Sequence, residues 1–432
     1  MAGPKITLVG GCSGAGVTLA GTVAQHPELR GAHLHYFDIN ESGLKTLLDV
    51  ARLVNDYHNF DLVITGGCDR REALEDSDFL FFSFAVDRLQ LWYDMLHIAL
   101  KHGVQQVEGL DYGTGGFLAT LCNAPIAIDI CADAEKYCSN AIVLIRTSPP
   151  SRIVMAVSLY SNMKAVGLCH NPWEVNLTLM DKLNMKEDEF EVQLAGLNHC
   201  WWIMKMTAKD GRDLYPEFRR NVLAKDPHRT SLETQLMDVF GFYPYVSGPH
   251  MSESLAWGWR YHGMHTGEER MKKVELRKQE WHDLEKMATA SSLDVGNETA
   301  QKCVGGHPSS QMAIKPIAHM IANRGERIPA VDLKNDGFIT NLPDDAAVGV
   351  PATADRNGIH GQKIGDLPTG IASLIQLQYG TQRLAVEAAA TRSRTLAIQA
   401  LTLDPHVRDM ETARRILDDI YAWHGDRLPK LE

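Results

Sequence analysis

The stretch KITLVGGCSGAGVTLAGTVA, residues 5–24, decides how the chain begins to fold. Residues 5–9 are apolar enough for a short buried strand, and the residues after the glycines have the composition of a helix. A glycine-rich turn between a strand and a helix lets backbone amides approach a pyrophosphate at the N-terminus of the helix. The glycine spacing is not the usual G-x-G-x-x-G, so a plain tight turn is the alternative interpretation of this stretch taken alone.

The segments that follow favour nucleotide binding. Residues 33–37 predict a second strand that ends in Asp38, and an acid about 20 residues further on can bind the ribose hydroxyls of NAD and disfavours the 2′-phosphate of NADP. Residues 62–65, 79–84 and 141–146 predict further strands with helices between them. This alternation predicts an α/β fold, with a Rossmann-like, doubly wound, mostly parallel sheet and a mixed, largely helical C-terminal lobe.

Ligands of a doubly wound sheet collect at the carboxyl ends of its strands. Thr147 and Ser148 follow the strand predicted at 141–146, so we expect them where a nicotinamide or a sugar would lie. The residues that we predict to bind the cofactor are Gly10, Gly11, Cys12, Ser13, Gly14, Asp38, Ser83 and Thr147.

Composition excludes several classes of function. The 432 residues carry a net charge of −11, which argues against nucleic acid as a partner, because phosphate neutralisation needs clustered Lys and Arg. No apolar run predicts a membrane span, and the first residues do not resemble a signal peptide. Eight scattered cysteines suggest reduced thiols in the cytoplasm. The length predicts two parts: an NAD-binding domain at 1–195, and a lobe at 196–432 for substrate, metal and oligomerisation.

Two short blocks, GLCH at 167–170 and GLNH at 196–199, each end an apolar run with residues that can bind a metal. Cys169 and His199 are far apart in sequence, so they are no local chelating motif. Two protein ligands would leave positions that sugar hydroxyls could fill. Spacing alone favours a buried thiol and a core histidine with a satisfied hydrogen bond over a metal site.

These blocks resemble glycoside hydrolase family four, the NAD- and Mn-dependent glycosidases, and especially its α-galactosidase branch. The resemblance runs from Ile6 nearly to the C-terminus. Besides the two blocks above, it rests on DLYPE at 213–217, NDGFITNLP at 335–343, IGDLP at 364–368 and LAVEA at 384–388. The family implies NAD, Mn or another divalent metal held by Cys169 and His199, and a homodimer or homotetramer.

The family also implies a mechanism for an unphosphorylated α-hexopyranoside. The sugar is oxidised at C3, loses the C2 proton to a base, expels its leaving group, takes up water and is reduced again, so the net reaction is hydrolysis. The metal would stabilise the enolate. The base is expected at His307, in a block that matches the family, with Asp111 or Tyr112 as alternatives.

The chain departs from the family at positions that face the substrate. Cys12 replaces the third glycine of the turn, Ser148 replaces the asparagine of a Thr-Asn-Pro tripeptide, and the base block holds neither Tyr nor Asp. These departures, with Arg146 beside the tripeptide, favour the related NAD-dependent sulfoquinovosidases, and a sulfoquinovoside is the expected substrate. The residues expected to contact it are Arg146, Ser148, Asn198, His170, His250 and Arg260.

Other functions stay open at this level. An α-galactosidase or α-galacturonidase would use the same mechanism. A 2-hydroxyacid-type dehydrogenase would need no metal and would release NADH with its product. A degenerate NAD-binding protein would bind NAD but catalyse no reaction. The absence of the family's asparagine and of a Tyr or Asp base is the observation that keeps this alternative open.

Overall fold

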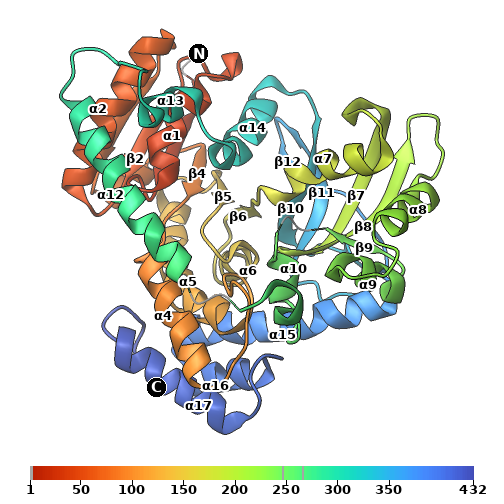
Figure 1. The fold of residues 1–432 in the computed structure, drawn as a ribbon. Helices are drawn as coiled ribbons and strands as arrows, with labels where there is room; N and C mark the ends of the chain where they lie inside the picture. The colour runs from red at the N-terminus through yellow and green to blue at the C-terminus, as the bar shows by residue number, and fades with distance from the viewer. Residues whose placement is uncertain (1–2, 246–247, 265–266) are drawn as a thin grey trace.

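The computed structural model describes residues 3–245, 248–264 and 267–432. In these ranges twelve strands form one sheet in the order β3-β2-β1-β4-β5-β6-β10-β11-β7-β8-β9, with β12 paired to β11. Figure 1 shows the sheet running through the middle of the molecule with helices packed around it. The predicted α/β class is therefore confirmed.

The first six strands of this order are parallel. Their order, 3-2-1-4-5-6, is that of a dinucleotide-binding sheet, so the Rossmann-like prediction is confirmed. The third strand lies at 63–67 rather than 62–65, and the fourth ends at Phe82 rather than at residue 84. The bounds are β1 (Lys5–Val9), β2 (His33–Phe37), β3 (Val63–Gly67), β4 (Phe79–Phe82), β5 (Ile142–Ile145) and β6 (Lys164–Gly167).

The other strands extend the same sheet in antiparallel fashion. Asp332 pairs with Gly167 where β10 meets β6, and this pairing joins the second half of the chain to the end of the parallel half. The bounds are β7 (Phe190–Leu197), β8 (Cys200–Ala208), β9 (Tyr243–Tyr245), β10 (Glu326–Lys334), β11 (Ala347–Asp355) and β12 (Gly358–Gly361).

Helix α5 spans Gly113–Tyr137. Its length and composition would suit a membrane span, but 67% of the apolar window is buried and the helix packs against α4, α6 and α15. It is therefore a core helix. The other helices of this half are α1 (Gly14–Val23), α2 (Glu41–His58), α3 (Arg70–Leu74), α4 (Arg88–Lys101), α6 (Pro150–Tyr160) and α7 (Asn171–Leu183), with short 3-10 turns at Pro27–Leu29 and Glu187–Glu189.

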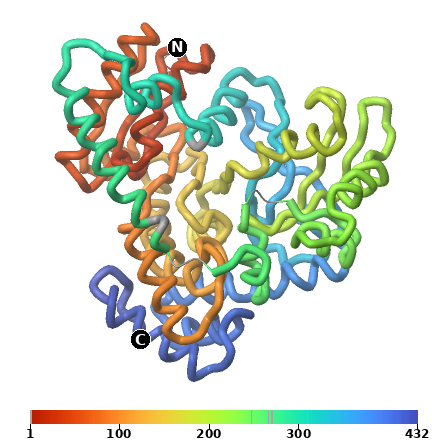
Figure 2. The backbone as a smooth tube through the Cα atoms, viewed as in Figure 1, coloured from red at the N-terminus to blue at the C-terminus, as the bar shows by residue number. Residues whose placement is uncertain are grey.

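The helices of the second half return to the first. Helix α12 packs on α2 and α4, and α13 and α14 pack on α1, as the green and teal segments over the red and orange ones show (Figure 2). The bounds are α8 (Tyr215–Lys225), α9 (Leu232–Phe240), α10 (His250–Glu253), α11 (Trp259–His262), α12 (Glu268–Ala288), α13 (Glu298–Gly305), α14 (Pro308–Ala322), α15 (Thr369–Thr391), α16 (Arg394–Leu403) and α17 (Met410–His424).

Residues 290–306 are small and polar, a composition typical of a loop, but they contain α13. The side chain of Asn297 caps the helix by accepting from the amide of Ala300. Ala300 and Cys303 are buried, and Gly21 of α1 lies so close that a Cβ there would be 2.0 Å from the carbonyl oxygen of Cys303. This helix is thus formed by a cap and by contact with α1.

Candidate active site

The glycine-rich turn joins β1 to α1 at the carboxyl edge of the parallel strands. Gly10 adopts a φ of 93°, and its amide and that of Gly11 donate to the carbonyl of Phe37 at 3.0 and 2.8 Å. A Cβ on Gly16 would lie 1.8 Å from the carbonyl oxygen of Gly11, so the first turn of α1 can close on the loop only with glycine there. The amides of residues 10–13 donate within the protein, so the first amides of α1 are the ones that can approach a pyrophosphate.

The other residues assigned to the cofactor lie around this turn. Asp38 ends β2 and accepts from the amide of Cys12 at 2.8 Å, which ties the acid to the turn. Ser13 Oγ donates to Ser83 Oγ at 3.2 Å. Thr147 is buried, and its hydroxyl bonds both the amide and the carbonyl of Phe84 at 3.1 and 3.0 Å, so it joins the ends of β4 and β5.

Arg146 lies between the turn and the second half of the site. Its Nη1 donates to Ser83 Oγ at 3.2 Å, and within the described part of the chain its guanidinium has no carboxylate partner. Burial lowers the pKa of Arg146 to about 10, and Arg88 and Arg277 add to this lowering. An unpaired cation in such surroundings is a ready partner for an anion brought by a ligand.

Cys169 follows β6, and His199 lies on the tight turn between β7 and β8 with a φ of 60°. The pairing of β6 with β10, and of β11 with β7, brings these distant segments together. Both residues are buried, and their side chains share a hydrogen bond. His199 Nδ1 also forms an ion pair with Asp111 Oδ2 at 2.8 Å. The structure thus brings the two predicted metal ligands into contact.

The electrostatics of this contact favour a thiolate. Burial raises the pKa of Cys169, but His199 and a hydrogen bond from His170 outweigh it and lower the pKa to about 6. Burial opposes a charged His199, but Asp111 and Cys169 raise its pKa well above the ordinary value. In Asp111 burial is outweighed by His199, and the pKa is lowered. The three groups therefore hold one another in their charged forms.

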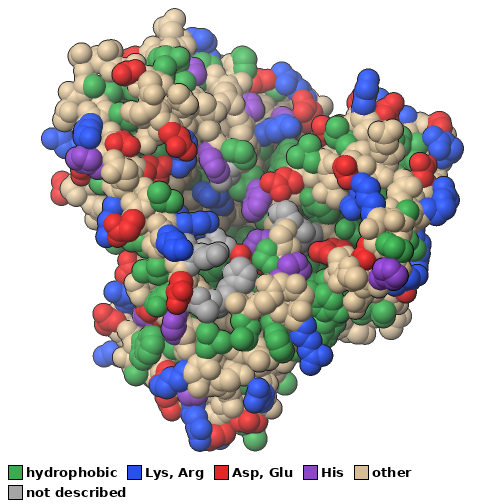
Figure 3. Space-filling model, viewed as in Figure 1, with side chains coloured by type: hydrophobic (Ala, Val, Ile, Leu, Met, Phe, Trp, Pro, Cys, Tyr) green, Lys and Arg blue, Asp and Glu red, His purple; other side chains and the backbone are tan. Residues whose placement is uncertain are grey.

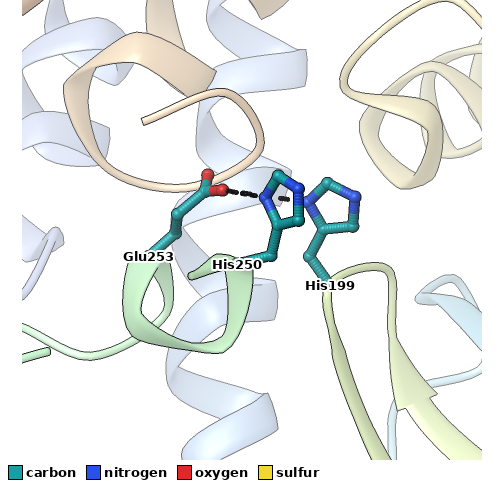
Figure 4. Close-up of side chains that lie close together, drawn as sticks. All are labelled: His199, His250 and Glu253. Atoms are coloured by element: carbon teal, nitrogen blue, oxygen red, sulfur yellow. Dashed lines mark hydrogen bonds and ion pairs between the residues drawn. The ribbon is translucent and has the colours of Figure 1, made fainter. Parts of the chain in front are cut away.

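A second imidazole lies beside the first (Figure 4). The rings of His199 and His250 are 4.1 Å apart between centroids and inclined by 30°. Glu253 Oε1 is 2.5 Å from His250 Nδ1, and Glu253 Oε2 accepts from the amides of Leu110 and Asp111. His199, His250 and Glu253 each offer one atom that could bind a metal, and these three atoms lie within 4.8 Å of one another. Both carboxyl oxygens of Glu253 already form these bonds, so the role that fits Glu253 is to orient the imidazole of His250.

These groups fit a divalent metal. A ligating histidine commonly has its second ring nitrogen held by a carboxylate, and Asp111 and Glu253 hold the Nδ1 atoms of His199 and His250 in this way. A thiol must lose its proton before it can bind a metal, and the lowered pKa of Cys169 meets that need. Cys169 and His199 would hold the ion, with His250 beside them.

Asp332 is an acidic residue of the site that could not be recognised from the sequence. It lies on β10, is 1% exposed, and neither carboxyl oxygen has a hydrogen-bond partner among the described residues. Burial raises its pKa well above the ordinary value, and the charges of Cys169 and Asp111 add to this. The sequence VDLK at 331–334 is typical of a half-exposed strand. Asp332 is directed toward the site because β10 pairs with β6, where Asp332 lies opposite Gly167.

The remaining candidates differ in how closely they approach this cluster. Asn198 donates to Asp111, and its carbonyl accepts from the hydroxyl of the fully buried Tyr112. His170 and His307 line a common pocket of about 520 Å³. Ser148 precedes a cis peptide bond to Pro149, and its carbonyl accepts from Asn123. Arg260 is exposed on α11, with its guanidinium over the ring of Trp259.

A hollow opens between the two halves of the molecule, with histidines, lysines and arginines on its walls (Figure 3). A dinucleotide-binding sheet whose carboxyl edge faces a buried thiol, two imidazoles and carboxylates defines a nucleotide-dependent enzyme with a metal site. Comparison with known proteins identifies the class further. Residues 5–185 match the model of family 4 glycosyl hydrolases, and residues 194–407 match that family's C-terminal domain. The chain belongs to glycosyl hydrolase family 4, as the sequence blocks predicted.

Similar proteins cover nearly the whole chain. An α-galactosidase of Bacillus subtilis is 29% identical over 441 residues and covers 99% of both chains. An α-galacturonidase of the same organism is 24% identical over 384 residues, which is 81% of this chain and 82% of that one. Among solved structures, a 6-phospho-α-glucosidase from gut microorganisms in complex with NAD and Mn²⁺ has a TM-score of 0.84 at 21% identity, with 100% of both chains covered.

Proposed function

We propose that the protein hydrolyses an unphosphorylated α-hexopyranoside with the help of NAD and Mn or another divalent metal. The observation that carries the proposal is the contact of Cys169, His199 and Asp111 beside the carboxyl edge of a nucleotide-binding sheet. The family and the NAD and Mn²⁺ of the similar 6-phospho-α-glucosidase support it. A dehydrogenase without a metal would have no use for this arrangement.

The chain's own residues can be given roles. Bound NAD would supply hydride transfer at C3 of the sugar, and a bound metal would supply polarisation of the sugar's oxygens. The turn at 10–14 and Asp38 hold the dinucleotide, and Ser83 and Thr147 shape its nicotinamide end. Cys169 and His199 hold the metal, Asp111 orients His199, and His250 contacts a hydroxyl beside them. Transient oxidation at C3 makes the C2 proton acidic enough for a side-chain base to remove.

We assign the base to His307. Burial, with the charges of Lys302 and Arg146, lowers the pKa of its imidazole, so that the ring is neutral at pH 7 and can accept a proton. Asp111 is already bound to His199 and Asn198, and the hydroxyl of Tyr112 donates to the carbonyl of Asn198. Those two alternatives serve better as supports of the β7–β8 turn.

The substrate is a sulfoquinovoside in our preferred assignment. The half-buried guanidinium of Arg146 has no carboxylate partner among the described residues, so an anionic substituent on the sugar would satisfy it. A C6 sulfonate or carboxylate supplies such a charge, and the similarity to an α-galacturonidase supports an acidic sugar. Ser148 would leave more room beside it than the asparagine usual in the family. Arg260 is a weaker candidate because it is exposed on Trp259.

A substrate screen tests the proposal. Nitrophenyl α-galactoside, α-galacturonide and α-sulfoquinovoside are incubated with the purified protein, with and without NAD and Mn²⁺. We expect release of nitrophenol from the sulfoquinovoside, lost when either cofactor is omitted or when a chelator is added. Hydrolysis without NAD would contradict the mechanism, and preference for the uncharged galactoside would contradict the role of Arg146.

These roles assign different functions to the two expected domains of the chain. Residues 1–195 would carry the dinucleotide and supply Cys169, and residues 196–432 would supply His199, the substrate contacts and the surfaces of a homodimer or homotetramer. The eight cysteines form no disulfide, which suits the reducing cytoplasm. Light scattering of the purified protein measures its oligomeric state, and a monomer at micromolar concentration would contradict the proposed homodimer or homotetramer.

A further inference from the structure

A buried arginine that the proposed function does not use lies behind the candidate metal site. Arg152 is the third residue of α6, is 1% exposed, and is among the largest side chains that are fully buried. Its Nε and Nη2 atoms have no hydrogen-bond partner among the described residues. Because a buried cation costs free energy unless opposite charges lie near it, the groups around Arg152 indicate what it does.

Two buried carboxylates on separate segments flank this guanidinium. Asp111 precedes α5 and Asp404 follows α16, and both α6 and α16 pack on α5. A Cβ on Gly113, at the start of α5, would lie 3.7 Å from His406 Nδ1, which bonds to Asp404. Burial lowers the pKa of Arg152, and the charges of Asp404 and Asp111 oppose this lowering. The guanidinium thus lies within the electrostatic reach of both carboxylates.

Packing at Gly116, on the first turn of α5, shows how closely Arg152 approaches Asp111. A Cβ on Gly116 would lie 2.4 Å from the carbonyl oxygen of Asp111 and 3.0 Å from Nη2 of Arg152. Glycine therefore leaves the room in which the guanidinium lies beside the backbone of Asp111. Oδ1 of Asp111 is also buried without a hydrogen-bond partner among the described residues, so this carboxylate has capacity for a further positive neighbour.

The stability of the fold does not account for a charge at this position. Asp111 Oδ2 already pairs with His199 Nδ1 at 2.8 Å. Asp404 Oδ1 already pairs with His406 Nδ1 at 2.8 Å. Replacement of a buried ion by an apolar side chain of similar volume is often neutral or stabilising, provided that no opposite charge is left unpaired. A methionine would fill this space without the cost of burying a charge, so the charge of Arg152 points to a role in the site.

We propose that Arg152 is a positioning residue of the metal site. Its guanidinium fixes Asp111 in place, and Asp111 in turn holds the imidazole of His199 in the orientation that binds the metal. The proposal rests on the glycosidase function proposed above, in which Cys169 and His199 hold the metal. Arg152 is buried in the core and would reach neither substrate nor cofactor, so it acts on the reaction only through the affinity for the metal.

Metal affinity, measured without substrate, tests the proposal. In Arg152→Met the affinity for Mn²⁺ should fall about tenfold, as expected when a residue that supports a metal ligand is removed, while the affinity for NAD stays within about twofold. Arg152→Lys should lose about threefold, because the ammonium keeps the charge but lacks the planar fork. Calorimetric titration of the purified full chain measures both affinities. If Arg152→Met does not fold, Arg152→Lys decides, and wild-type Mn²⁺ affinity in that variant would overturn the proposal.

Asp404→Asn is the matched control. It removes a charge from the same buried cluster, beside the same guanidinium, but it leaves Asp111 and its contact with Arg152 in place. It should bind Mn²⁺ with the wild-type affinity even if its melting temperature falls. An equal loss of Mn²⁺ affinity in Asp404→Asn and Arg152→Met would show a general disturbance of the core and overturn the positioning role, as would wild-type affinity in Arg152→Met.

Activity separates this proposal from the proposed function. Saturating Mn²⁺ should restore kcat of Arg152→Met to within about twofold of the wild type, because only the affinity for the metal is changed. A deficit in kcat that saturating Mn²⁺ does not restore would overturn the positioning role. If Arg152→Met binds Mn²⁺ less tightly but the wild type hydrolyses no glycoside, the proposed function fails and the positioning role stands. If the wild type binds no Mn²⁺, both are overturned.

Discussion

Cys169 illustrates how single residues set the chemistry of this site. A thiol buried to this degree ordinarily has a raised pKa, as Cys122 and Cys131 do, both at about 12. His199 and His170 reverse that effect at Cys169 and lower its pKa to about 6. The positive charge on His199 is in turn stabilised by its ion pair with Asp111. The thiol is therefore a thiolate at neutral pH, the form that binds a divalent metal.

Asp111→Asn tests the support of His199. The amide keeps the size of the side chain but removes the charge that orients the imidazole, so we expect Mn²⁺ affinity to fall about 10- to 100-fold, while NAD binding is unchanged. Calorimetric titration with Mn²⁺ measures the affinity. Asp133→Asn on the surface of α5 should match the wild type, and equal metal affinity in Asp111→Asn would refute the role.

Arg146→Met tests the anionic substrate. Removal of the guanidinium should lower kcat/KM for the sulfoquinovoside by about 100-fold, the loss expected for a buried charged hydrogen bond. The rate for an uncharged α-galactoside should stay the same or rise. Arg146→Lys should recover only part of the loss, because the ammonium lacks the planar fork. Equal losses on both substrates would show that Arg146 acts on the cofactor or the fold instead.

Cys169 and His199 could be predicted from the blocks at 167–170 and 196–199, Asp111 was named only as an alternative base and His250 only as a substrate contact, and Asp332 was not predicted. Each block follows an apolar run and ends in residues that can bind a metal, which is visible along the chain. Asp332 sits inside a strand whose alternation looks ordinary. Its burial follows from the pairing of β10 with β6, a contact over 165 residues of sequence. Such a contact leaves no local pattern.

At the scale of elements, the turn into α1 depends on close packing of backbone against backbone. Gly16→Ala would place a methyl group 1.8 Å from the carbonyl oxygen of Gly11. We expect this variant to lose about 1–3 kcal/mol of unfolding free energy. Gly14→Ala is the matched control, because a Cβ there meets nothing within 4 Å. Thermal unfolding without NAD measures both, and equal melting temperatures would contradict the packing argument.

Strand β2 carries a histidine whose burial makes the stability of the fold depend on pH. Burial lowers the pKa of His35 to about 4, and Lys5 and His33 add to this. Between pH 6.5 and 4 the unfolded chain binds a proton that the folded chain does not, so stability falls as the pH is lowered through this window.

In His35→Asn this pH dependence should weaken by an amount on the order of 1 kcal/mol between pH 6.5 and pH 5. The amide can keep the bond to Thr65 that His35 Nδ1 makes at 2.9 Å. Urea unfolding at pH 7, 6 and 5 measures the effect. Parallel pH profiles for the variant and the wild type would show that His35 is protonated alike in both states.

At the scale of the whole molecule, the parallel half of the sheet could be predicted because its strands are short apolar runs separated by helices. The antiparallel half could not, because β10, β11 and β12 come late in the chain and join β6 and β7 by long-range pairing. Helix α13 could not be predicted either, since its sequence is small and polar and its burial comes from α1. The site lies where the two halves of the sheet meet.

We propose that the site where the two halves of the sheet meet hydrolyses a glycoside by transient oxidation of the sugar at C3. Hydrolysis of the accepted glycoside in D2O, followed by NMR of the released sugar, tests it most directly. The account predicts deuterium at C2 of the product and no net accumulation of NADH, because the C2 proton is removed and replaced in every turnover. A product without deuterium at C2, or NADH formed in step with product, would contradict it.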